Sequence, residues 1–99
     1  MPASVLPAAA VSDRAAAPFS VSFSIRALAE PGVMPRLVEL FAKRGLIPQR
    51  WTSTVSEQAL SVDVEMTGLD REMADYIARC MRLIHGVETV LTVESCPAL

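Results

Sequence analysis

Few side chains in this chain of 99 residues have the type and spacing that catalysis requires. The single histidine, His85, ends an apolar helical pattern, where its charged form interacts favourably with the helix dipole. Asp63 and Glu65 lie two residues apart in an alternating segment, so both face the same side of one strand as Ser61. A small enzyme would have to use these groups with Arg26, but a solvated sheet face is the default interpretation of the carboxylates. We therefore expect a protein that is not an enzyme.

The two cysteines do not predict a metal site or a disulfide. Cys80 falls on the apolar face of a predicted helix, where a free cysteine packs as a small core residue. Cys96 adjoins Pro97 and forms no CxxC pair with Cys80. No phosphate loop, nucleophile elbow or metal-ligand spacing is present in the sequence. We expect no bound metal ion and no cofactor.

A turn at residues 29–34 is the segment that most favours ligand binding. Pro31-Gly32 separates an alternating strand pattern from a helical one. Glycine permits positive φ and lets another group approach the backbone closely. The free N–H groups of Val33 and Met34, at the start of the helix, suit a carboxylate such as that of an amino acid. A plain tight turn is the alternative interpretation.

The elements that position this turn follow from hydrophobic periodicity. Alternating apolar residues predict strands at 19–28, 47–55, 60–66 and 87–94. Helical spacing predicts helices at 33–44 and 71–85, the second capped by Asp70. Glycines 45 and 86 end the two helices. The order is strand, helix, strand, strand, helix, strand.

This βαββαβ order predicts an α+β fold, the ferredoxin-like sandwich, with a four-stranded antiparallel sheet and two helices on one face. The expected spatial order of the strands is fourth, first, third, second. Residues 19–95 form the predicted domain. Residues 1–18, rich in alanine and proline, are predicted to be a flexible tail, and residues 96–99 a short C-terminal tail.

Composition excludes several partners. The net charge of −2 and the pI of about 5.3 lack the basic excess of nucleic-acid-binding proteins. The exposed sheet face is predicted to hold Ser22, Ser24 and Asp63 and no aromatic residue for base stacking. No apolar run approaches the ~18 residues of a membrane span, and no basic segment starts a signal peptide. We expect a cytoplasmic protein that binds neither nucleic acid nor a membrane.

The turn and the helix after it resemble an ACT domain, a small amino-acid-sensing module. The resemblance rests on Glu30-Pro31-Gly32-Val33, then Leu37, Leu40-Phe41 and Arg44-Gly45. Within that family the chain is most similar to the small regulatory subunit of acetolactate synthase. The resemblance implies a homodimer with side-by-side sheets that binds and activates a thiamine-diphosphate-dependent catalytic subunit in branched-chain amino acid biosynthesis. A free-standing amino-acid sensor acting on another metabolic enzyme is the alternative.

The resemblance also implies where an effector would bind. The implied effector-binding residues form two segments: Ala29, Glu30, Pro31, Gly32, Val33 and Met34, and then Ile47, Pro48, Gln49 and Arg50. Two of them depart from the family pattern, because Ala29 stands where effector-binding members often have Asn or Asp, and Ile47 where valine-sensing small subunits have Asn. Each lost hydrogen bond weakens binding by roughly 1–3 kcal/mol. We therefore expect weak or absent valine sensing.

Overall fold

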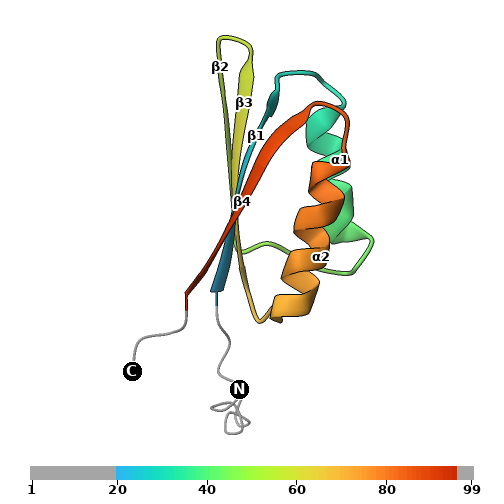
Figure 1. Ribbon diagram of the computed structural model, residues 1–99, viewed down its shortest axis with the longest axis vertical. Helices are drawn as coiled ribbons and strands as arrows, with labels where there is room; N and C mark the ends of the chain where they lie inside the picture. Colours follow the sequence, from blue (N-terminus) through green and yellow to red (C-terminus); the bar gives the residue numbers. More distant parts are fainter. Residues whose placement is uncertain (1–19, 96–99) are drawn as a thin grey trace, which may run out of the picture.

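The computed structural model describes residues 20–95, which form a two-layer α/β sandwich (Figure 1). The elements are β1 (Ser20–Leu28), α1 (Val33–Ala42), β2 (Arg50–Ser56), β3 (Ala59–Thr67), α2 (Arg71–Arg82) and β4 (Val87–Ser95). The predicted βαββαβ order is therefore confirmed. The tails predicted at 1–18 and 96–99, together with Phe19, lie outside the described residues.

The four strands form one antiparallel sheet in the order β2-β3-β1-β4, as predicted. Both helices lie on one face of the sheet, and the other face is open (Figure 1). β2 and β4 are consequently the two edge strands. Pro48 precedes β2, which begins at Arg50 rather than at residue 47, and proline next to an edge strand is consistent with its lack of an N–H for strand pairing.

The core lies between the two layers and is built by alternation along β1 and β3. Every second residue of both strands is buried, and the residues between them face the open side. The register pairs inward residues with inward residues, for example Phe23 with Val64 and Ile25 with Val62. The largest fully buried side chains are Phe23, Phe41, Ile25, Leu37, Ile77, Met81, Val21, Val33, Val62 and Val64.

Helix α1 ends two residues earlier than its apolar pattern predicts. It buries Val33, Leu37 and Phe41 and stops at Ala42. Lys43 and Arg44 belong to a turn that closes at Gly45, whose φ of +69° places it in the left-handed region. The turn directs the chain back toward the sheet, and the N–H of Leu46 donates to the Phe41 carbonyl at 2.9 Å.

Helix α2 begins as predicted but presents a different face to the sheet. The Asp70 carboxylate accepts a hydrogen bond from the Met73 N–H at 2.8 Å, which is the expected N-cap. The apolar spacing predicts a buried stripe of Leu69, Met73, Ile77, Cys80 and Ile84, widened by Tyr76, Met81 and Leu83. The buried residues of α2 are Ala74, Ile77, Ala78 and Met81, so Ile77 and Met81 are confirmed, whereas Met73 and Cys80 are only partly buried. Two alanines let the helix approach the sheet closely, and the larger side chains beside them remain partly exposed.

Neither α1 nor α2 has the length and apolar character that a helix needs to cross a bilayer, and no other helix occurs within residues 20–95.

Candidate functional site

Two apolar grooves lie along the same side of the domain, where α1 runs next to the edge strand β2. The first, here called the loop groove, lies under the β1–α1 connection and has a volume of about 340 Å³. Its lining residues are Ala29, Glu30, Pro31, Met34, Val55 and Leu60. The second, the aromatic groove, has a volume of about 320 Å³. Its lining residues are Val38, Phe41, Ala42, Leu46, Ile47, Pro48 and Trp51.

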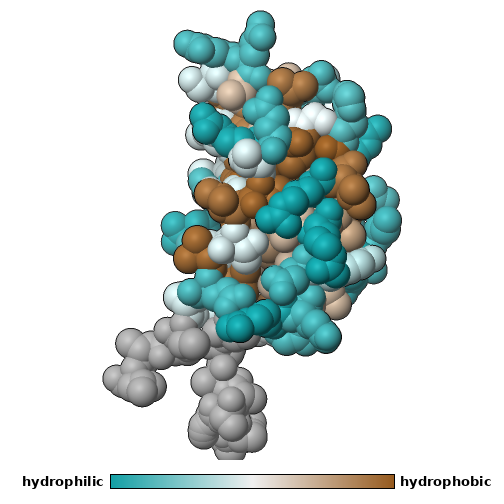
Figure 2. All heavy atoms as spheres, in the orientation of Figure 1, coloured by the Kyte–Doolittle hydropathy of each residue, from teal (hydrophilic) through white to brown (hydrophobic). Residues whose placement is uncertain are grey.

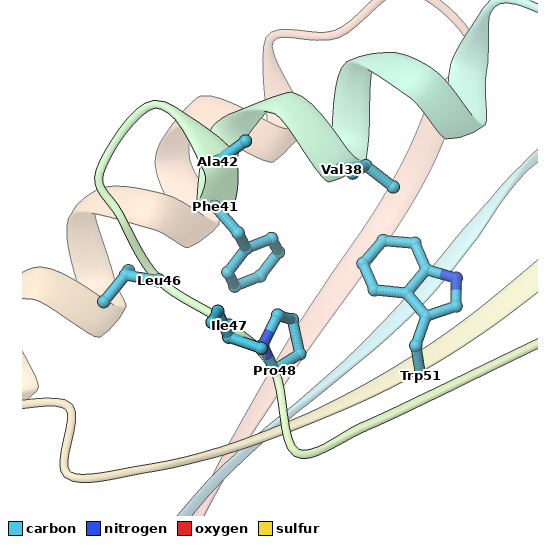
Figure 3. A pocket seen from close by; sticks show the side chains of 7 residues that line it. All are labelled: Val38, Phe41, Ala42, Leu46, Ile47, Pro48 and Trp51. Carbon is cyan, nitrogen blue, oxygen red and sulfur yellow. The ribbon is translucent and has the colours of Figure 1, made fainter.

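Aromatic packing shapes the aromatic groove. The rings of Phe41 and Trp51 lie edge to face with centroids 6.1 Å apart, and Phe41 meets Phe23 of the core at 6.0 Å. Figure 3 shows Phe41, Pro48 and Trp51 turned toward one another around the open space. Because all seven lining side chains are apolar, this groove suits a hydrophobic group and offers no charged side chain to a ligand.

Backbone hydrogen bonds hold the loop groove in shape. The Ala29 N–H donates to the Gln58 carbonyl at 3.0 Å, which fixes the β1–α1 connection to the β2–β3 turn. The Leu28 N–H donates to the Gly86 carbonyl at 2.8 Å on the other side. Glu30 is the one ionisable side chain in the lining, so this groove suits an apolar group or one bearing a positive charge.

The structure does not give Gly32 and Val33 the roles in ligand binding that the sequence predicts for them. Gly32 has φ −81°, so its backbone is in the right-handed helical region and does not require glycine. A Cβ there would lie 2.6 Å from Nη1 of Arg36, which donates to the Gly32 carbonyl at 3.1 Å. The Val33 N–H already donates to the Glu30 carbonyl at 3.1 Å, so it is not free for a carboxylate as predicted, and the Val33 side chain is buried.

The residues implied by the resemblance divide between the two grooves and the sheet. Ala29, Glu30, Pro31 and Met34 line the loop groove, while Ile47 and Pro48 line the aromatic groove.

Gln49 and Arg50 line neither groove. The Thr67 N–H donates to Oε1 of Gln49 at 2.8 Å, and the Gln49 amide also bonds to the Thr67 hydroxyl. Arg50 lies 3.8 Å from the Glu65 carboxylate in an exposed ion pair. These two side chains therefore tie β2 to the far end of β3.

Seven lining residues were not among the sequence candidates, namely Val38, Phe41, Ala42, Leu46, Trp51, Val55 and Leu60. They come from α1, the connection after it, β2 and β3, and only the packing of those segments brings them to the grooves. Val55 and Leu60 pair with each other next to the turn between β2 and β3. The position of this turn beside the β1–α1 connection is the feature that would have identified them.

The groups considered for catalysis do not converge. Arg26, Asp63 and Glu65 lie on the open face of the sheet, where Asp63 accepts a hydrogen bond from Ser24 at 2.9 Å and Glu65 pairs with Arg50. His85 lies in the turn between α2 and β4. Within residues 20–95 no cluster of three or more His, Cys, Asp or Glu side chains has a geometry that could hold a metal ion.

Two exposed apolar side chains interrupt the polar open face of the sheet. Leu91 and Val93 of β4 pair across from Ser24 and Ser22 and are exposed. Figure 2 shows apolar atoms at the surface beside β4, among predominantly polar ones. They lie on the opposite edge of the sheet from the two grooves.

Solved structures with the same fold include an ACT domain and an uncharacterized protein. The crystal structure of the ACT domain from GTP pyrophosphokinase of Chlorobium tepidum superposes with a TM-score of 0.69 at 12% identity, covering 77% of this chain and 99% of that one. The solution structure of the same domain gives 0.66 at 12% identity, covering 77% and 86%. An uncharacterized protein from Thermotoga maritima gives 0.66 at 14% identity, covering 78% and 96%.

Sequence comparison assigns the family independently of these superpositions. No curated protein matches the sequence. A family profile described as an ACT-like domain matches residues 13–98, which is most of the chain and includes every described element. With the βαββαβ fold and the two grooves beside α1, this match shows that the chain belongs to the ACT-like domain family.

Proposed function

We propose that this protein is a non-catalytic regulatory subunit that forms a dimer through its β2 edge and acts on a metabolic enzyme. The observation that carries the proposal is the division of the implied effector-binding residues between two grooves at opposite ends of one exposed edge. The loop groove contains Met34 and Val55, and the aromatic groove contains Ala42 and Trp51. A second copy paired along the same edge would bring its aromatic groove next to the loop groove of the first.

A two-fold axis beside Ser53 gives a self-complementary pairing of the two edges. Antiparallel pairing of β2 with the partner's β2 then sets Trp51 opposite the partner's Val55, an aromatic and β-branched pair. Val55 faces the helix side of the sheet but is 63% exposed, because no further strand lies beside it in one protomer. In this arrangement the loop groove of each protomer adjoins the aromatic groove of the other.

The β4 edge is less suited to pairing. Nη2 of Arg82 on α2 donates to the Val90 carbonyl of β4 at 2.8 Å, and Arg71 forms a 2.8 Å ion pair with Glu94. Charged side chains placed along a strand edge oppose the addition of another strand. β2 carries one charged residue, Arg50, at its beginning. We therefore choose β2 for the interface.

Acetolactate synthase is the enzyme that we propose as partner. The choice rests on the likeness of Glu30-Pro31-Gly32 and Arg44-Gly45 to the small subunit of that enzyme. Ala29 and Ile47 stand in or beside the grooves where directed polar groups would hold an amino acid. We accordingly propose activation of the catalytic subunit with weak or absent response to valine. A free-standing amino-acid sensor for another enzyme remains the second candidate, supported by the two grooves themselves.

Mixing the protein with the acetolactate synthase catalytic subunit of the same organism tests the proposal. We expect the two to co-elute in gel filtration and the activity to rise, with little change on adding valine. The matched control is a Val55→Asp variant, which should lose the dimer and, with it, the activation. A dimer that neither co-elutes nor activates would contradict the choice of enzyme and favour the second candidate. A screen of amino acids for thermal stabilisation would follow.

A further inference from the structure

Ile47 is an apolar side chain that the protomer leaves in solvent next to the proposed interface. It is 84% exposed, although it lines the aromatic groove of its own protomer together with Leu46 and Pro48. It lies in the connection that runs from α1 to the start of β2. An exposed isoleucine is unremarkable when it is isolated, but this one lies at the end of a strand edge that we assign to a second copy.

The two-fold pairing places Ile47 at the loop groove of the partner. Trp51 lies opposite the partner's Val55 and Arg50 opposite its Ser56, so the proposed pairing sets the start of β2 beside the partner's β2–β3 turn. That turn is bonded to the β1–α1 connection through Ala29 and Gln58. The side chain of Ile47 therefore reaches the level of the groove that lies under this connection.

The loop groove is suited to such a side chain. Five of its six lining residues are apolar, and its volume of about 340 Å³ is at the small end of ligand pockets. Charges at the same place are also complementary. Arg50, held only loosely at 3.8 Å from Glu65, would lie across from the partner's Ser56 and next to the partner's Glu57, which is exposed.

We propose that Ile47 of each protomer fills the loop groove of the other, so that the protein itself occupies the interface position of an effector. The inference rests on the proposed β2-edge dimer and adds the regulation of its site. The dimer is then held together without a ligand, and valine neither strengthens nor displaces it. An apolar residue at position 47 thus serves as a built-in occupant.

Cysteine pairs distinguish contact between protomers from contact within one. Two variants, Ala29→Cys and Ile47→Cys, are made in a chain with Cys80→Ala and Cys96→Ser. Within a protomer these positions lie beyond opposite ends of α1, whose ten residues span about 15 Å, too far for a disulfide. We expect a mixture of the two variants to form a disulfide-linked dimer on oxidation. Neither variant alone should do so, nor should Ile47→Cys mixed with Val93→Cys.

Sedimentation equilibrium then separates failure of this inference from failure of the dimer. Ile47→Asp should raise the dimer dissociation constant at least about tenfold, the loss expected for removing one buried side chain. Val93→Asp, which changes a residue with 60% exposure on the other edge, should leave it unchanged. A wild-type chain that is monomeric throughout would overturn the proposed dimer. A dimer that Val55→Asp disrupts but Ile47→Asp and the cysteine mixture leave unaffected would overturn only the role of Ile47.

Discussion

At the scale of single residues, the capping of α2 has a clear energetic consequence. Asp70 satisfies the Met73 N–H, one of the helix donors that otherwise has no partner. We expect Asp70→Ala to lower the free energy of unfolding by about 1 kcal/mol. Asp75→Ala, which removes an exposed carboxylate from the same helix, should change it by less than about 0.5 kcal/mol. Urea unfolding of both variants checks this, and equal losses would contradict the capping role.

Gly86 and Gly45 offer a second comparison at this scale. Both have positive φ, +98° and +69°, which disfavours any residue with a side chain. A Cβ on Gly86 would also lie 3.0 Å from Cγ2 of the buried Val33, whereas a Cβ on Gly45 would meet nothing within 4 Å. We expect Gly45→Ala to destabilise the fold by about 1 kcal/mol and Gly86→Ala by about 2–3 kcal/mol.

Thermal unfolding followed by circular dichroism measures both glycine variants under identical conditions. The difference between them combines the contact with Val33 and the less favourable backbone of Gly86, whose φ of +98° lies farther from the left-handed helical region than the +69° of Gly45. If Gly86→Ala lowers the melting temperature no more than Gly45→Ala does, the contact between position 86 and Val33 does not contribute to the loss of stability.

At the scale of the elements, the two helices are joined by an aromatic clamp. The Arg44 guanidinium lies 4.7 Å from the centre of the Tyr76 ring and donates to the Leu40 carbonyl at 2.9 Å, so it links the end of α1 to α2. Arg79 lies at 5.9 Å from the same ring. We expect Tyr76→Leu to destabilise the domain by about 1 kcal/mol, because a cation–π contact at a partly exposed site has that size.

A double-mutant cycle measures the coupling across the clamp directly. Arg44→Met and Tyr76→Leu together should lose less than the sum of the two single changes, with a coupling of about 0.5–1 kcal/mol. The same cycle with Arg79→Met should give a smaller coupling, since Arg79 is farther from the ring. Additive losses for Arg44 and Tyr76 would show that the clamp contributes nothing beyond packing.

Alternating apolar residues and the residues typical of turns were sufficient to predict the order of the helices and strands. The strands β1 and β3 alternate strictly, so period 2 determines both their existence and their buried face. The face of α2 was misjudged because alanine gives a weak hydrophobic signal, although a small residue is what allows a helix to lie close to a sheet. Ala74 and Ala78 are buried against the sheet, whereas Met73 and Cys80, which the apolar spacing predicts to be buried, are only partly so.

The candidate site could be predicted only in part, for a physical reason. The turn at Glu30–Pro31 and the segment at Ile47–Pro48 are visible as breaks in local periodicity. Trp51 and Val55 line the grooves because β2 lies at the edge of the sheet, and strand order is a property of the whole fold. The division into two grooves arises because α1 and β2 run in opposite directions and hold the two segments apart.

At the scale of the whole molecule, the small size of the domain gives the proposed dimer a thermodynamic role. A domain of fewer than 80 residues buries a limited core and gains stability from oligomerisation. Val38 on α1 lines the aromatic groove and is 45% exposed, and we place it close to the proposed two-fold axis beside Ser53. A charged residue at position 38 would place two like charges, one from each protomer, in the dimer interface.

We expect the melting temperature of the wild-type chain to rise with protein concentration, because only folded chains associate into the dimer and association therefore stabilises the folded state. Val38→Asp should abolish this dependence and melt at the temperature of the dilute wild type. Val93→Asp, on the opposite edge, should retain the dependence. Trp51, the single tryptophan, reports the same equilibrium, since its fluorescence should shift to the red on dilution as the edge is exposed. A concentration dependence that survives Val38→Asp but disappears in Val93→Asp would move the interface to β4.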